Sequence, residues 1–144
     1  MPGRRAAREL ALQALYQLDL LGEADQERSL DVFWTHFEAP EDVKAFAREL
    51  VEGVRAHRGR IDALLAESTE HWRLSRLSRV DLNLLRLATF ELLARAEIPT
   101  PVSINEAIEI ARRFGSADSA AFVNGVLDRV AEVLGVKEKA GRVG

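Results

Sequence analysis

The chain has 144 residues, of which 47% are apolar and 30% charged, a composition typical of a globular protein rather than a disordered one. It contains no cysteine, which excludes disulfides, thiolate metal sites and a cysteine nucleophile. We find no signal peptide and no apolar run long enough to span a membrane, so we expect a cytoplasmic protein. The formal net charge is −3, but residues 1–8 carry three arginines and no acid, so a basic face is still compatible with this total.

Every long segment has the periodicity of an α-helix. A helix is predicted over 4–21, because apolar residues recur on one face and Gly22 follows at the position of a C-terminal cap. Its predicted buried stripe is Ala7, Leu10, Ala11, Ala14, Leu18 and Leu21.

A short helix is predicted to begin at Ser29 as N-cap, with Leu30, Phe33, Trp34 and Phe37 on its buried face. Pro40 is predicted to open one long helix to about residue 67, bent at Gly59.

Residues 68–77 are the least regular stretch, and we interpret them as a seam between two halves. Ser78 and Asp81 then form an S-x-x-D helix start. The helix that follows, to about residue 96, is apolar nearly all round, which is typical of a central, buried helix.

The stretch from Ser103 to Glu106 has the pattern of a capping box and is predicted to open a helix that ends at Phe114. A last helix is predicted over about 118–134. The sequence thus predicts an all-α fold with about seven helices in two small packed bundles. We expect one domain over 1–144, with an N-terminal half at about 1–67 and a C-terminal half at about 78–135.

The residues needed for catalysis or metal binding do not occur in the usual patterns. His36, His57 and His71 share no ligand-like spacing, and neither a nucleophile elbow nor a phosphate-binding glycine loop is present. Glu106 and Glu109 lie one helical turn apart, which fits a cap and a solvated face better than an acid–base pair. We therefore expect no enzyme activity, no metal and no cofactor.

Arginines at the start of the first predicted helix oppose the helix dipole, and Arg4 and Arg8 lie on one face where they repel each other. Either they bind phosphates or they belong to a solvated terminus. If they serve RNA and not stability, replacing both by alanine should weaken RNA binding and leave the fold intact. Phe114 and Phe122 flank a short polar loop, where they either stack on unpaired bases or anchor helix ends in the core.

Four stretches of the sequence resemble the bacterial transcription antitermination factors of the NusB family. They are RRAARELALQALYQLDL at 4–20, LLRLATFELL at 84–93, PVSINEAIEIARRFG at 101–115 and FVNGVLDRVAEVL at 122–134. The similarity extends over essentially the whole chain, and the INEAIE and FVNGVLD blocks are specific to the family. It implies two small helical bundles, in agreement with the periodicity.

The resemblance implies an RNA-binding adaptor that joins NusE, a ribosomal protein, on the boxA segment of nascent ribosomal RNA and helps RNA polymerase read through terminators. The implied RNA-contacting residues are Arg4, Arg5, Arg8, Phe114, Asp118 and Phe122. The implied NusE-facing residues are Tyr16, Leu20, Arg76 and Asp81. Some members of the family form homodimers that cover the RNA surface, and both states are compatible with this sequence.

Two alternatives belong to other functional classes. The first is a helical protein–protein scaffold that binds no RNA, which a salt-dependent RNA titration would distinguish from an antitermination factor. The second is an enzyme, because the same helical module also occurs fused to ribosomal-RNA cytosine methyltransferases. That activity needs a Rossmann-like domain and a catalytic cysteine, and this sequence contains neither.

Overall fold

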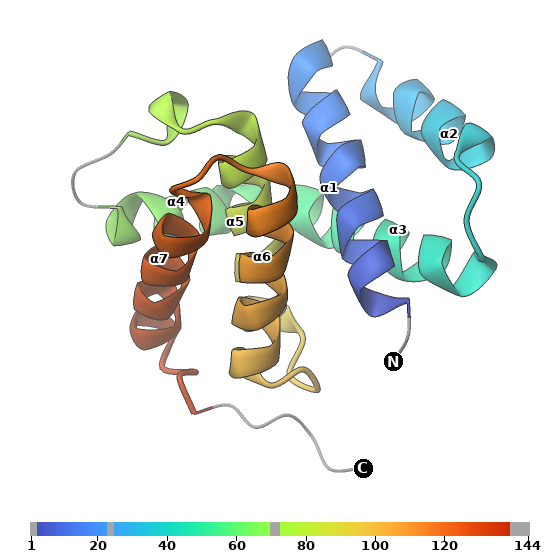
Figure 1. The fold of residues 1–144 in the computed structure, drawn as a ribbon. Coiled ribbons are helices and arrows are strands. Elements are labelled where there is room, and N and C mark those ends of the chain that lie inside the picture. Colours follow the sequence, from blue (N-terminus) through green and yellow to red (C-terminus); the bar gives the residue numbers. More distant parts are fainter. Residues whose placement is uncertain (1–2, 23–24, 70–72, 139–144) are drawn as a thin grey trace.

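The computed structural model describes residues 3–22, 25–69 and 73–138, and in these ranges it contains helices and no β-strand (Figure 1). The α-helices are α1 (Arg4–Leu21), α2 (Gln26–His36), α3 (Glu41–Ala56), α4 (Arg58–Ser68), α5 (Arg79–Ala94), α6 (Thr100–Phe114) and α7 (Ser119–Leu134). A short 3-10 turn, Leu74–Arg76, precedes α5. The predicted all-α class with about seven helices is confirmed. None of the described helices is both long and apolar enough to cross a membrane.

Helix α1 packs on α3 and α5 through a face rich in alanine, whose small side chains allow close approach. The predicted stripe of α1 is buried except for Leu21, which is exposed because it lies at the end of the helix. Helix α2 lies at the outer edge of the molecule and packs mainly on α1 (Figure 1).

Helix α2 does not start where the sequence predicted. It begins at Gln26, after Asp25, whose φ of 59° is left-handed. Ser29 is not an N-cap, because it lies inside the helix. Its hydroxyl accepts a hydrogen bond of 3.0 Å from the side chain of Gln17, which links α2 to α1. Phe37 lies just beyond the helix, more exposed than predicted, and its ring stacks on that of Phe33 at 4.9 Å.

The single long helix predicted from Pro40 to about residue 67 is two helices in the structure. The chain breaks at His57, with φ −110° and ψ 16°, and not at Gly59. The break redirects the chain: α3 packs on α1 and α5, whereas α4 packs mainly on α5 and α7. By its contacts α4 therefore belongs with the C-terminal helices. The helices that the chain packs against change at His57, before the predicted seam at 68–77. Residues 70–72 of that seam lie outside the described ranges.

Helix α3 packs tightly against α5 at Gly53. A Cβ atom built on Gly53 would lie 2.1 Å from Cζ of Phe90, which is buried. We expect Gly53→Ala to lower the free energy of unfolding by about 1 kcal/mol, because an overpacking cost of about 1–3 kcal/mol exceeds the gain in helix propensity of up to about 1 kcal/mol. Urea denaturation measures the change. Gly59→Ala is the control, because a Cβ atom at Gly59 would meet no atom within 4 Å. This substitution should stabilise the chain, since alanine has the higher helix propensity.

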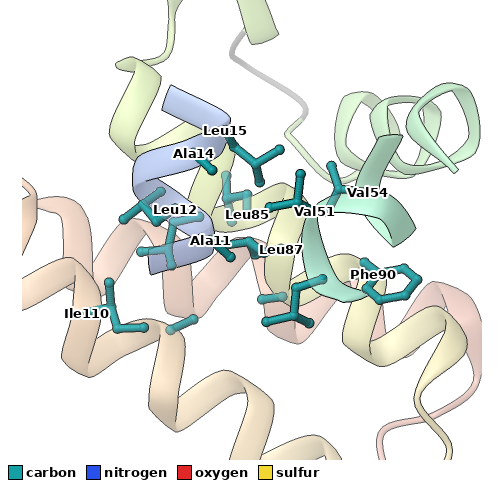
Figure 2. Close-up of a cluster of buried hydrophobic side chains, with 14 of the residues drawn as sticks. Ala11, Leu12, Ala14, Leu15, Val51, Val54, Leu85, Leu87, Phe90 and Ile110 are labelled. Carbon is teal, nitrogen blue, oxygen red and sulfur yellow. The ribbon is translucent and has the colours of Figure 1, made fainter. Parts of the chain in front are cut away.

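Helix α5 is the central element, as its apolar sequence predicts. Its S-x-x-D start is confirmed, because the Ser78 hydroxyl accepts a hydrogen bond of 3.1 Å from the backbone N–H of Asp81. The helix packs against α1, α3, α4, α6 and α7. Figure 2 shows Leu85 and Leu87 of α5 between residues of α1 and residues of α3. One core thus extends through helices from both halves of the chain.

The capping box predicted at Ser103 is wrong. Helix α6 begins three residues earlier, at Thr100, after Pro99. Ser103 is fully buried, and its hydroxyl donates a hydrogen bond of 2.9 Å to the Glu91 carboxylate of α5. Glu106 reaches α1 instead of the start of its own helix. Both side chains are used in tertiary contacts, which a local pattern does not reveal.

Candidate nucleic-acid and partner interfaces

The three N-terminal arginines of α1 lie in three different environments. The guanidinium of Arg4 is half-buried and stacks 4.0 Å from the centre of the Phe46 ring of α3, a cation–π contact that orients it. Within the described ranges Arg4 forms no ion pair with a carboxylate. A guanidinium group in this position can bind an anion such as a phosphate.

Arg5 is exposed and forms a bidentate ion pair with Glu106 of α6. Its Nε lies 3.2 Å and its Nη2 2.5 Å from the two carboxylate oxygens. The hydrogen bonds from Arg5 lower the pKa of the Glu106 carboxyl below its usual value, and the same pair raises the pKa of Arg5. Glu106 is therefore ionised at neutral pH, and the positive charge of Arg5 is largely balanced.

Arg8 is buried, with 4% of its surface exposed. Its Nε and Nη2 each donate a hydrogen bond of 2.8 Å to Glu91, which is also buried. The inference that stability does not explain Arg8 is therefore wrong, because its charge compensates a buried carboxylate of the central helix. The expectation that Arg8 can be replaced without harm to the fold is corrected for the same reason. Its guanidinium is not presented to solvent as a phosphate ligand.

An apolar groove of about 410 Å³ lies along the other end of α1. Tyr16 and Leu20, both predicted to face a partner, line it with exposed fractions of 38% and 59%. Phe33 and Phe37 of the α2 region and Phe114 at the end of α6 line it as well. Phe114, predicted to contact RNA, thus lies with the residues predicted to face the partner.

A second hollow of about 250 Å³ lies between the starts of α5 and α7. It brings together the other predicted residues from both sets, which are Arg76, Asp81, Asp118 and Phe122. Asp118 is exposed and occupies the N-cap position of α7, but its side chain makes no capping hydrogen bond. The nearby Ser119 hydroxyl instead accepts a hydrogen bond of 2.9 Å from the backbone N–H of Ser116.

No group of three or more potential metal ligands occurs in the described part of the chain. The ring Nδ1 atoms of His36 and His57 each lie 2.9 Å from a backbone carbonyl in the preceding turn of the chain, while His71 is outside the described ranges.

Comparison with known proteins assigns the chain to a family. The model of the NusB family matches residues 5–132. The chain belongs to the NusB family. The transcription antitermination protein NusB of Myxococcus xanthus is 52% identical over 139 residues, which cover 93% of this chain and 98% of that protein. NusB of Desulfitobacterium hafniense is 48% identical, over 96% of this chain and 94% of that protein.

Solved structures of the family have the same fold. NusB of T. maritima superposes with a TM-score of 0.81 and is 40% identical, over 92% of each chain. A chain in the crystal structure of antitermination factors NusB and NusE in complex with dsRNA superposes with a TM-score of 0.80 and is 26% identical. The superposition covers 92% of this chain and 98% of that one.

Sequence reasoning missed two polar networks of this NusB-family chain. One joins Arg86 of α5, which is buried, to Asp62 of α4 and Asp19 of α1. The other links α1, α5 and α6. Glu91, Ser103 and Glu106 surround Arg8 and hold the first turns of α1 against α6. One signal was available: Glu91 is an acidic residue within a helix whose apolar residues lie on nearly all sides. A buried carboxylate requires a cation, and Arg8 was a candidate.

Proposed function

We propose that this NusB-family chain is an RNA-binding transcription antitermination factor that binds boxA RNA together with NusE. In this proposal the complex acts on nascent ribosomal RNA with RNA polymerase in the bacterial cytoplasm and promotes processive transcription. The role consists of binding, with no catalytic step. The whole chain acts as one unit, since α5 packs on helices from both halves.

The observation that carries the proposal is the match to the NusB chain solved in complex with NusE and dsRNA, which extends over 92% of this chain with a TM-score of 0.80. At 26% identity the backbone is retained while many side chains differ. The residues of this chain must therefore support the role by themselves.

The RNA-binding part of the proposal rests on Arg4, Arg5 and the hollow at the start of α7. Two exposed or half-exposed guanidinium groups next to each other in α1 suit backbone phosphates, which arginine binds in a bidentate manner. In the hollow, the half-buried ring of Phe122 suits stacking on an unpaired base, and Asp118 lies beside it at the start of α7.

The partner-binding part rests on the apolar groove. An exposed tyrosine and leucine one turn apart contribute little to an isolated helix, but they are typical of the centre of a protein interface. Arg76 and Asp81 of the second hollow would supply polar contacts that set the orientation of NusE. A homodimer that covers the RNA surface would instead compete with RNA.

The test is a titration of the chain with boxA-like and scrambled single-stranded RNAs, each with and without NusE, at several salt concentrations. We expect saturable binding, tighter for boxA, with log K falling by about 0.7 per phosphate contact for each unit of log salt. A scaffold without RNA binding would give no saturable signal at any salt concentration. Equal binding of both RNAs would contradict the boxA assignment.

Asp118 provides a more specific prediction. We expect Asp118→Asn to bind RNA about twofold to fivefold more tightly, because it removes a negative charge from a surface that meets phosphates. The melting temperature should change little, because the Asp118 side chain makes no capping hydrogen bond and asparagine is equally favourable at an N-cap. Fluorescence anisotropy with boxA RNA measures the change. Weaker binding at unchanged stability would instead identify the carboxylate as an acceptor for a base or a sugar.

A further inference from the structure

Arg5 differs from its neighbours because its ion pair crosses between two helices at the surface. Its side chain is 52% exposed, while that of Glu106 is only 19% exposed. The two residues are 101 positions apart in the sequence, and the pair closes the first turn of α1 onto α6. The exposed partner is therefore the arginine, and the more buried one is the carboxylate.

Glu106 is held in place from its other side by the buried network. Its Oε1 lies 3.6 Å from Nη1 of Arg8. Arg8 is in turn fixed by two hydrogen bonds of 2.8 Å to Glu91, and Glu91 accepts a further one from Ser103. The Glu106 carboxylate is thus anchored by a rigid set of buried groups, and it retains a cationic neighbour if Arg5 moves away.

We propose that Glu106 is an affinity-setting residue of the RNA site, which competes with an RNA phosphate for the guanidinium of Arg5. Carboxylate and phosphate both accept the paired N–H donors of arginine in the same planar geometry, so Arg5 can exchange one for the other. RNA binding then requires Arg5 to leave Glu106. This inference rests on the proposed RNA-binding function and adds to it a residue that lowers the affinity.

The same geometry explains why the exchange is feasible. Ion pairs between exposed groups are weak, and Arg5 lies on the exposed side of the pair. Arg8 cannot undergo such an exchange, because its own ion pair is buried. Among the three N-terminal arginines, Arg5 is therefore the one whose availability is controlled by an exchangeable carboxylate.

The experiment compares the affinities of single-residue variants for a boxA-like single-stranded RNA by fluorescence anisotropy at one fixed salt concentration. We expect Glu106→Gln to bind about threefold to fivefold more tightly than the unmodified chain, as loss of one half-exposed ion pair predicts. Glu109→Gln is the matched control. It removes the same charge one turn further along α6, where Glu109 forms an ion pair with Arg112 of its own helix and acts on Arg5 only through its charge, without a hydrogen bond. We expect it to change the affinity less than twofold.

Two further variants separate competition from general effects of charge and folding. In an Arg5→Ala background, Glu106→Gln should tighten binding no more than Glu109→Gln does, because the competed group is absent. Glu106→Asp keeps the net charge but withdraws the carboxylate from Arg5, so it should also tighten binding, by a smaller factor. It serves as the test if thermal unfolding shows that Glu106→Gln does not fold.

The outcomes are distinguishable. If the unmodified chain binds RNA saturably and Glu106→Gln equals Glu109→Gln, the competition is refuted while the proposed function stands. The same holds if Glu106→Gln still tightens RNA binding in the Arg5→Ala background, because a gain in affinity without Arg5 reflects only the change in net charge. If neither the unmodified chain nor any variant binds RNA, with or without NusE, the proposed function itself fails and the competition fails with it.

Discussion

Replacing Arg8 by alanine is expected to lower the free energy of unfolding by about 3–5 kcal/mol, the cost of leaving a buried charge without its partner. The charge in question is the carboxylate of Glu91, which is 1% exposed in the central helix. Arg8 donates two hydrogen bonds of 2.8 Å to it. Urea denaturation monitored by circular dichroism measures the change.

Arg5→Ala is the matched control for this prediction. It removes the same side chain three residues away, but Arg5 is exposed, and we expect a loss of no more than about 0.5–1 kcal/mol. Combining Arg8→Met with Glu91→Leu should recover much of the lost stability, because apolar residues of similar size can replace a buried ion pair. A loss for Arg8→Ala no larger than for Arg5→Ala would show that the buried pair contributes little.

Replacing Tyr16 by alanine is expected to weaken NusE binding at least tenfold, which corresponds to about 1.4 kcal/mol. The loss reaches about 2 kcal/mol or more if the ring is a hot spot of the interface. Tyr16 lines the apolar groove together with Leu20 and Phe114. Because 38% of its surface is already exposed in the isolated chain, the melting temperature should fall only slightly. Calorimetric titration with NusE and a thermal melt measure the two quantities.

Leu21→Ala is the control for Tyr16. Leu21 is also an exposed apolar residue of α1, but it lines a different hollow, against α2. We expect its replacement to change NusE affinity less than twofold. A large fall in melting temperature for Tyr16→Ala with unchanged NusE affinity would assign the tyrosine to the fold and not to the interface.

The helices could be predicted from the sequence because each buries a continuous apolar face, and this periodicity is a local property. The central position of α5 followed from the same argument, since its apolar residues leave no solvated face. The errors lie where a tertiary contact overrides a local signal. Ser103 has the spacing of a cap but donates its hydrogen bond to another helix. Likewise, the change of direction at His57 depends on how α4 packs on α5 and α7.

The candidate site was predicted in part. The exposure of Tyr16 and Leu20 follows from their angular position on α1, which is again local. The different environments of Arg4, Arg5 and Arg8 do not, because they depend on partners elsewhere in the chain. Arg8 and Glu91, for example, are 83 positions apart. Helical spacing alone places Arg4 and Arg8 on one face, and only the fold shows that one of them is buried.

The peripheral position of α2 gives the two proposed interfaces different mechanical properties. Phe33 and Phe37 form one wall of the apolar groove, yet α2 packs mainly on α1. A helix with few neighbours opens at a lower free energy than the core, so this wall can adapt its shape to a bound protein. The arginine end of α1 is instead pre-organised by the buried ion pair of Arg8. The arginine end of α1 is therefore rigid, while its other end lines a groove whose α2 wall can change shape.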